Sequence, residues 1–258
     1  KPTLGALSNS GVVPACRTLD TVSVFALTVP DAWTAFRAAA FYDKKDAYSR
    51  KIQIPPLRTP PPITCVGVPN PATREFFGDT YQAQCFDRAL AGLTEAGVKI
   101  RELDFTPFYE VAEMLYNGAW VAERLSVIGD LILKTPEAIH PVTRQVISKG
   151  GSLTAVDAFR GTYRLAELRR IAAPLLDQVD MLCVPSIPTF YSLGDLDADP
   201  IGPNSRLGTY TNFVNLMDLC AIAVPCRPRN DGRPGSFTLV ASAGQDASVA
   251  ALANVLHR

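Results

Sequence analysis

Short apolar runs alternate along the chain with longer stretches in which apolar residues recur every three or four positions. The short runs are rich in Val, Ile, Leu and Cys, and this pattern predicts buried strands at residues 64–69, 98–103, 180–185, 221–225 and 236–241. The longer stretches predict helices at about residues 79–96, 109–132, 155–178, 205–218 and 246–257. Such alternation favours an α/β fold with a helix-flanked, largely buried sheet.

Two stretches interrupt this pattern. Residues 50–62 contain too many prolines for a helix interior or a central strand, so they predict an extended surface connection. Residues 185–203 interleave Pro, Gly, Asp and Ser and predict a surface loop near a strand end. Loops that follow strands are where α/β proteins form their sites.

Composition narrows the classes of partner and location. The chain has 258 residues, which suits one large domain, and its 25 basic and 25 acidic residues give a formal net charge of zero. We therefore expect no nucleic-acid partner and no anionic membrane surface. The longest apolar stretches, such as residues 22–27, are far shorter than the roughly 20 residues needed to cross a bilayer. The chain begins at Lys1 without a leader-like segment, so either end could be trimmed.

Six cysteines are scattered without a CxxC pair, mostly inside apolar runs, and this usage predicts buried thiols in a reducing cytoplasm. They are Cys16, Cys65, Cys85, Cys183, Cys220 and Cys226.

Several kinds of chemistry lack sequence support. His140 and His257 are the two histidines, and neither has the setting of a catalytic histidine. HExxH, P-loop, GxGxxG, GxSxG and SxxK motifs are absent, so we expect no metal, no cofactor and none of the familiar serine-hydrolase arrangements. Asp197 and Asp199 lie in a loop and are interpreted as solvated turn formers.

Four blocks of sequence resemble the amidase-signature family in their order and spacing. The opening run KPTLGALSNSGVVPACRTLDTVSVFALTV is similar to the segment that follows the family's catalytic serine loop, and its central part is especially similar to allophanate hydrolases. The other blocks are LYNGAWVAER, MLCVPSIPTFY and LGTYTNFVNLMDLCAIAVP, whereas CRPRNDGRPGSFTLV departs from the family's usual pattern. The resemblance implies a mixed, helix-flanked sheet of amidase-signature type. Residues 1–258 would then be the C-terminal portion of one such domain.

The resemblance also implies where the catalytic residues lie. In this family a lysine, a bridging serine and a nucleophilic serine form the triad, and all three lie in a signature region upstream of the Lys1 equivalent. We therefore expect no catalytic residue in this chain. Lys1 is not the family's lysine, and Ser8, Ser10 and Ser23 match none of the triad members, so they are interpreted as turn and core residues. The upstream catalytic segment, and any downstream second domain, would lie outside the chain.

Recognition of a substrate is what this portion is expected to supply. Allophanate, the substrate that the resemblance implies, is a small planar carboxylate bearing a urea-like amide, and arginine suits such a group best. Tyr116 and Arg124 match the family's substrate contacts. Eight residues apart on one helix, they would differ in direction by about 80° and line one cleft. Without the resemblance, a helical Tyr and Arg would be interpreted as packing or surface residues.

Other polar residues near these blocks receive blander interpretations. Glu123 is taken as a solvated helix charge, and Trp120 as a packing residue. Thr189, Tyr191 and Arg206 are left unassigned.

The leading hypothesis is a cytoplasmic, homodimeric amidohydrolase that releases ammonia from allophanate, a small-molecule carboxylate and amide, without a cofactor. One alternative is another amidase of the same family, or an amidotransferase component that hydrolyses glutamine. A second is a non-catalytic fragment that only binds or assembles. Arg124 distinguishes the leading hypothesis from the other amidases, because a neutral amide such as a simple acylamide has no carboxylate to offer it.

Overall fold

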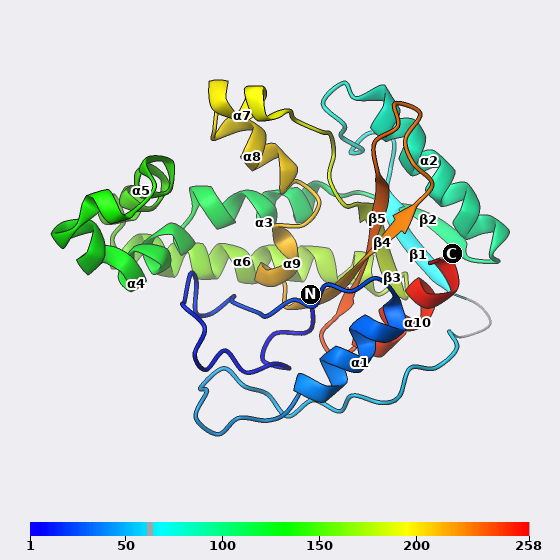
Figure 1. The fold of residues 1–258 in the computed structure, drawn as a ribbon, viewed down its shortest axis with the longest axis horizontal. Coiled ribbons are helices and arrows are strands. Elements are labelled where there is room, and N and C mark those ends of the chain that lie inside the picture. The colour runs from blue at the N-terminus through cyan, green and yellow to red at the C-terminus, as the bar shows by residue number, and fades with distance from the viewer. Residues whose placement is uncertain (61–63, 258) are drawn as a thin grey trace.

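Five strands form one mixed sheet in the computed structural model, which describes residues 1–60 and 64–257. The strands are β1 (Cys65–Pro69), β2 (Lys99–Leu103), β3 (Met181–Pro185), β4 (Leu219–Cys226) and β5 (Gly235–Ser242). Their order across the sheet is β2-β1-β3-β5-β4. The pairs β1/β2 and β1/β3 are parallel, whereas β5 runs antiparallel to both β3 and β4. All five predicted strands and the mixed sheet are confirmed (Figure 1).

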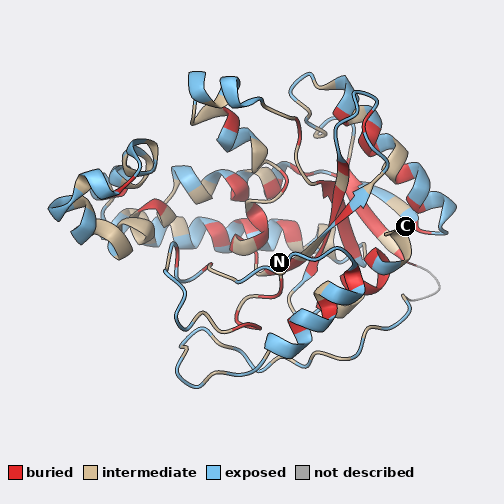
Figure 2. Ribbon diagram, viewed as in Figure 1, coloured by how far each residue is buried: buried red, intermediate tan, exposed pale blue. Residues whose placement is uncertain are grey.

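The central strands β3 and β5 are buried on both faces, so each contributes to two hydrophobic cores. In β3, Met181 and Cys183 join one core, and Leu182 and Val184, which alternate with them, join the other. This alternation is the period of two expected of a strand. Figure 2 shows the strands of the sheet largely in the colour of buried residues, with buried positions on the inward sides of the flanking helices. The molecule therefore has three layers, helix, sheet and helix.

One face of the sheet is covered by α1 (Val29–Ala39), α2 (Thr80–Glu95) and α10 (Asp246–Leu256). The sequence pattern did not predict α1, although its start carries helix signals: Thr28 caps the first turn by accepting a hydrogen bond from the Asp31 amide, and proline follows near the N-terminus. Trp33 and Phe36 of α1 are buried against the core of this face.

The opposite face is covered by α3 (Thr106–Asn117), α6 (Ala155–Leu176) and α9 (Phe213–Leu216). In Figure 1, α4 (Trp120–Lys134) and α5 (Pro141–Ser148) extend beyond this layer, away from the sheet. Shorter helical pieces complete the chain: α7 (Leu193–Ala198), α8 (Gly202–Leu207), η1 (Pro136–Ala138) and η2 (Lys149–Ser152).

Two predicted helices and one predicted loop differ from the elements observed in the structure. The single helix predicted at 109–132 is two helices, because the chain leaves helical geometry at Gly118, a residue of low helix propensity. The helix predicted at 205–218 is likewise divided into α8 and α9. The predicted loop 185–203 contains α7, whose first turn is held by a capping box between Ser192 and Asp195.

The proline-rich connection is free of helix and strand over residues 50–60, as predicted, and its residues 61–62 lie outside the described residues.

Gly67 in the middle of β1 gives a test of how tightly the sheet packs against its neighbours. A methyl group there would press on Leu103 and come 3.1 Å from Leu182 Cδ2. We expect Gly67→Ala to lower the free energy of unfolding by about 1–3 kcal/mol, the usual cost of overpacking a core. Urea unfolding of the protein that carries this chain measures the change.

The matched control is Gly92→Ala on the exposed surface of α2, where a methyl group meets no other atom within 4 Å. This change should leave stability unchanged or raise it by up to about 1 kcal/mol, because alanine favours helix. Equal effects of the two substitutions would contradict the packing argument.

Candidate functional site

Tyr116 and Arg124 lie on either side of a break between two helices. Tyr116 is in the last turn of α3, and Arg124 is in the second turn of α4. The expected geometry, one continuous helix, is therefore wrong. The two side chains nevertheless meet, with Cζ of Arg124 4.5 Å from the centre of the Tyr116 ring, a distance at which a cation and an aromatic face attract. The bend at Gly118, and not a shared helical face, brings them together.

Arg124 carries an unused hydrogen-bond donor. Its Nε is buried and has no hydrogen-bond partner among the described residues. Buried donors are nearly always paired in folded proteins, because leaving one unpaired costs about 1–3 kcal/mol. A half-buried guanidinium in this state is suited to bind an anionic ligand.

Two cavities adjoin this pair. Arg124 lines a cavity of about 220 Å³ together with Asp20, Thr211 and Asn215. Tyr116 lines a wider cavity of about 610 Å³ between α3 and residues 205–212. Asn212 borders both cavities. Tyr116 and Arg124 thus face neighbouring spaces that share one wall.

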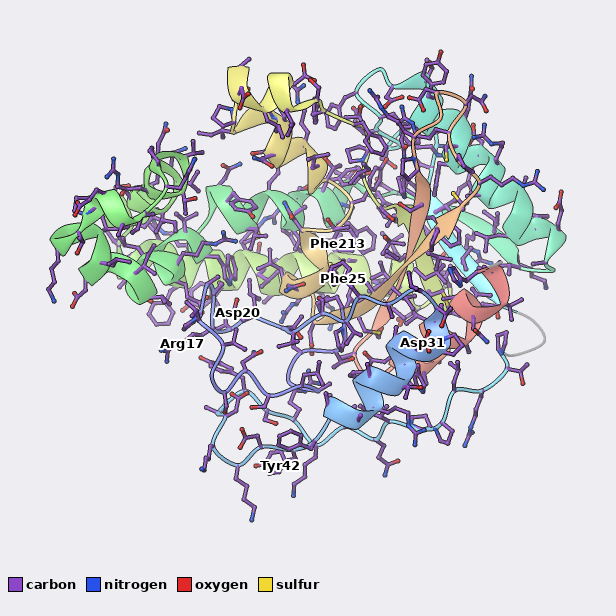
Figure 3. The ribbon with its side chains drawn as sticks, viewed as in Figure 1. Arg17, Asp20, Phe25, Asp31, Tyr42 and Phe213 are labelled. Carbon is purple, nitrogen blue, oxygen red and sulfur yellow. The ribbon has the colours of Figure 1, made fainter. Side chains whose placement is uncertain are left out.

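The first wall of the narrow cavity is a turn at residues 15–20. Asp20 closes this turn by accepting hydrogen bonds from the backbone N–H groups of Ala15 (2.9 Å) and Cys16 (3.0 Å). Figure 3 shows Asp20 on this N-terminal segment. Both carboxylate oxygens of Asp20 are therefore engaged by the backbone.

Glu123 fastens this turn to α4. Its carboxylate accepts hydrogen bonds from the Thr18 backbone N–H (2.8 Å), the Thr18 hydroxyl (2.7 Å) and the Cys16 thiol (3.0 Å). Burial and the nearby Glu123 carboxylate raise the pKa of the Cys16 thiol far above its usual range, so the thiol keeps its proton and donates it. The interpretation of Glu123 as a solvated helix charge is wrong, because its partners lie about 105 residues away and sequence spacing gives no sign of them.

The second wall is the turn at residues 208–212 and the start of α9. Tyr210 is fully buried, and its hydroxyl accepts a hydrogen bond from the Glu75 backbone N–H (2.8 Å) and donates one to the Glu75 carbonyl (2.9 Å). Phe213, seen in Figure 3, is also fully buried. The Asn215 side chain donates to the Leu19 carbonyl at 2.7 Å and so joins α9 to the N-terminal turn.

The serines and the lysine that were predicted not to be catalytic contact other parts of the protein or solvent. The hydroxyls of Ser8 and Ser10 each donate to Asp43 at 2.7 Å, and Ser23 is exposed. The Lys1 ammonium donates to the Leu219 carbonyl at 2.5 Å, and burial lowers the pKa of Lys1 to about 8.

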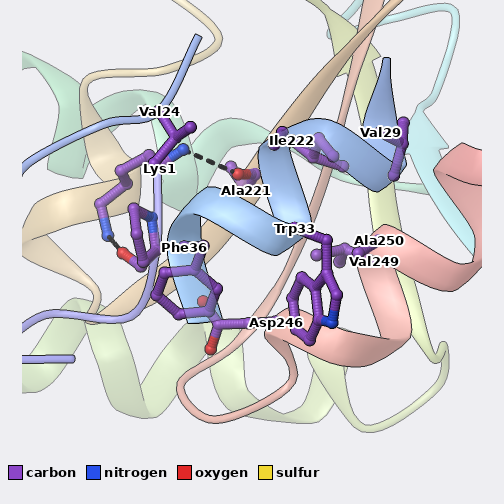
Figure 4. A pocket seen from close by; sticks show the side chains of 12 residues that line it. Lys1, Val24, Val29, Trp33, Phe36, Ala221, Ile222, Asp246, Val249 and Ala250 are labelled. Carbon is purple, nitrogen blue, oxygen red and sulfur yellow. Dashed lines mark hydrogen bonds between the residues drawn. The ribbon is translucent and has the colours of Figure 1, made fainter. Parts of the chain in front are cut away.

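Lys1 also borders a separate small cavity of about 70 Å³ under α1 (Figure 4). Trp33 and Phe36 form its apolar wall, and Asp246 stands at its edge. Arg124 is not among the residues that line this cavity.

A buried arginine, Arg229, was missed by sequence reasoning. It is 3% exposed and donates to Asp79 (2.8 and 3.1 Å), Gln82 (2.9 Å) and Asp231 (2.7 and 3.1 Å). Its guanidinium lowers the pKa of Asp231 to about 2. Thr189 donates to Asp79 in the same network at 3.0 Å. Because these donors are paired, Arg229 is a structural cation that holds the loop between β4 and β5.

Arg206 borders the wide cavity, with its Cζ 5.2 Å from the Phe77 ring and its guanidinium 3.5 Å from the Tyr191 hydroxyl.

Within residues 1–60 and 64–257, no group of three or more His, Cys, Asp or Glu side chains is placed to hold a metal ion. None of the helices described is both long and apolar enough to span a membrane.

Comparison with known proteins agrees with this architecture. The profile of the amidase family matches residues 1–250. The chain belongs to the amidase family. It is 38% identical over 257 residues to the urea amidolyase of Saccharomyces cerevisiae and 37% identical to that of Lachancea kluyveri, and each match covers 98% of this chain.

Solved structures of allophanate hydrolase and urea amidolyase also resemble this chain. Allophanate hydrolase from Kluyveromyces lactis superposes with a TM-score of 0.92 at 38% identity over 100% of this chain. The urea amidolyase from the same organism superposes with a TM-score of 0.93, also at 38% identity, over 98% of this chain. A glutamyl-tRNA(Gln) amidotransferase component from Thermotoga maritima, at 19% identity over 98% of this chain and 56% of its own, shares the fold with a TM-score of 0.77.

The chain spans only part of these relatives. It covers 14% of each yeast urea amidolyase, 43% of the allophanate hydrolase and 15% of the Kluyveromyces urea amidolyase.

The link between Glu123 and the N-terminal turn can be tested directly. We expect Glu123→Ala to free the Thr18 amide, because that amide loses its charged acceptor. A hydrogen bond to a charged group contributes about 1.5–3 kcal/mol, so exchange of this amide should accelerate roughly ten- to a hundredfold. Hydrogen–deuterium exchange resolved to residues 15–20 measures the effect.

Glu110→Ala is the control, since Glu110 pairs with Arg164 at the surface and does not contact this turn. It should leave exchange at Thr18 unchanged. Unaltered exchange at Thr18 in Glu123→Ala would show that the turn is held by other contacts.

Proposed function

We propose that this chain is the substrate-recognition part of an amidase that hydrolyses allophanate and releases ammonia. The observation that carries the proposal is the unpaired, buried Nε of Arg124, stacked on Tyr116 beside a small cavity. The likeness to allophanate hydrolase and to urea amidolyases supports the same substrate. A carboxylate on the substrate supplies the partner that Arg124 lacks in the protein.

The arrangement assigns a role to each side chain. Arg124 binds the substrate carboxylate through paired, charge-assisted hydrogen bonds. The Tyr116 ring limits how the guanidinium turns, and its hydroxyl adds a neutral donor. Glu123 acts through position alone, because it holds the turn at residues 15–20 that forms one wall of the cavity.

The bond cleaved is the terminal C–N bond of the amide. A serine oxygen attacks the amide carbon, and ammonia leaves after taking a proton. Water then releases the acyl group from the serine as N-carboxycarbamate. The serine, the bridging serine and the lysine belong to a segment outside this chain, so residues 1–258 are the C-terminal portion of one amidase domain and contribute no catalytic residue.

Exposed apolar side chains support this division of the domain. Phe25 is 96% exposed, Leu27 91% and Val13 86%, all on the N-terminal segment. Exposed apolar groups gathered on one segment are typical of a surface that another part of the protein covers. The chain also spans 43% of the allophanate hydrolase that it matches. We infer that the upstream part of the domain packs here, and that any further domain downstream acts on the product.

A cytoplasmic location and a homodimer complete the proposal. All six cysteines are free thiols, which suits a reducing compartment. Val156, Phe159 and Tyr163 form an exposed apolar stripe along α6 that is available for contact with a second copy.

A purely assembling fragment is disfavoured, because it would have no use for an unpaired cation in a cavity. Binding of the substrate carboxylate by Arg124 would distinguish allophanate hydrolysis from hydrolysis of neutral amides.

The chain made alone is expected to release no ammonia from allophanate, because the nucleophile lies outside it. It is also expected to unfold without a sharp transition, since part of its core is uncovered. Ammonia release and thermal unfolding of a purified chain, shown by mass to begin at Lys1, measure the two properties. Turnover above the uncatalysed background would overturn the placement of the triad, and a sharp transition would overturn the claim about the core.

Arg124→Ala tests the choice of substrate in the complete enzyme. Loss of a hydrogen bond to a charged group costs about 1.5–3 kcal/mol, so kcat/KM for allophanate should fall roughly ten- to a hundredfold. Hydrolysis of a neutral acylamide should change little, because such an amide has no carboxylate to lose. The measurement is the ratio of the two losses.

Arg206→Ala is the matched control, because Arg206 borders the wider cavity and not the cavity of Arg124. It should leave the ratio of the two kcat/KM values unchanged. An equal decline of both substrates in Arg124→Ala, with the fold intact, would make Arg124 structural. An unchanged rate with allophanate would favour a different amide substrate.

A further inference from the structure

Asn212 stands where the two cavities meet. It borders the cavity of Arg124 and the cavity of Tyr116, and its side chain is half-buried. Within the described residues, the Asn212 amide side chain makes no hydrogen bond, whereas that of Asn215, three residues further on, donates to the Leu19 carbonyl. A polar amide that faces a cavity without a partner is available to a ligand.

The turn that carries Asn212 is rigidly held. Tyr210 and Phe213, which flank it, are fully buried, and the Asn212 backbone N–H donates to the Gly208 carbonyl at 2.9 Å. Gly208 also leaves room for the side chain, since a methyl group there would lie 2.5 Å from Cγ of Asn212. The backbone that carries the Asn212 amide is thus held in place, and the side chain lies in the space that Gly208 leaves.

The polar groups around Asn212 show which kind of hydrogen bond its side-chain amide could contribute to ligand binding. Arg124 has only donors, and we have assigned the Tyr116 hydroxyl as a donor. Asp20, the carboxylate in the narrow cavity, has both oxygens occupied by backbone N–H groups. A substrate that also carries an N–H beside its carboxylate therefore needs an acceptor, and Oδ1 of Asn212 is a neutral one that does not repel the carboxylate.

We propose that Asn212 is a specificity-determining residue whose Oδ1 accepts a hydrogen bond from the substrate N–H that links the amide and the carboxylate. This inference rests on the proposed function, in which Arg124 binds the neighbouring carboxylate. It explains how the site distinguishes a ureido acid from an acid of the same shape with a methylene group at that position.

The test uses the full-length protein and two ligands that differ at one position. Allophanate has the linking N–H, and malonamate has CH₂ in its place. In Asn212→Ala we expect kcat/KM for allophanate to fall about three- to tenfold, as for loss of one neutral hydrogen bond. For hydrolysis of the same terminal amide in malonamate, kcat/KM should change less than about twofold, because malonamate has no N–H to make that bond.

Gly208→Ala gives a second, independent variant. Gly208 has φ −85° and ψ 0°, which alanine adopts without strain, so the added methyl group acts on the Asn212 side chain. We expect the same selective loss for allophanate. The double variant should be no worse than Asn212→Ala, since both changes remove one interaction. Asn204→Ala, an exposed asparagine that borders neither cavity, should behave as the unaltered protein.

The outcomes separate this inference from the function on which it rests. Turnover of allophanate by the unaltered protein, with equal losses for allophanate and malonamate in Asn212→Ala, would overturn the role of Asn212 alone. Unchanged kinetics with allophanate would do the same. A complete absence of turnover in the unaltered protein would overturn the proposed function and this inference together.

Discussion

The arrangement of this protein depends on a sheet that must be covered on both faces. Because β3 and β5 bury side chains on each side, helices pack above and below them, and the N-terminal segment is drawn along the edge strand β4. The Ala221 backbone N–H donates to the Lys1 carbonyl at 2.9 Å, and Asp246 accepts hydrogen bonds from both the backbone and the hydroxyl of Thr3. From these anchors the segment reaches α4, where Glu123 holds it. The cavity beside Arg124 is what lies between these covering elements.

The break at Gly118 then decides what faces the cavity. A methyl group at Gly118 would come 2.6 Å from the Met114 carbonyl oxygen, so the close turn between α3 and α4 requires glycine there. The bend lets the Arg124 guanidinium lie over the Tyr116 ring. An unbroken helix would have kept these two side chains about 80° apart around its axis.

The surroundings of two arginines, Arg229 and Arg124, differ in how many of their donors are paired. Arg229 has carboxylates and an amide around it, and its hydrogen bonds close the loop between β4 and β5 against α2. Arg124 is half-buried and lies over the Tyr116 ring, yet its Nε has no partner among the described residues. The unpaired donor costs stability, which agrees with the anion-binding role proposed for Arg124.

The sequence by itself determined the strands, most of the long helices, the membership of a family and the pair Tyr116 and Arg124 as candidates. These follow from hydrophobic period and from motifs, both of which are local along the chain. It did not reveal α1, the break at Gly118, the contacts of Glu123 with Thr18 or the cavity shared by Asn212. Those depend on residues brought together from far apart by burial of the sheet, and only the tertiary structure decides which polar groups are left without a partner.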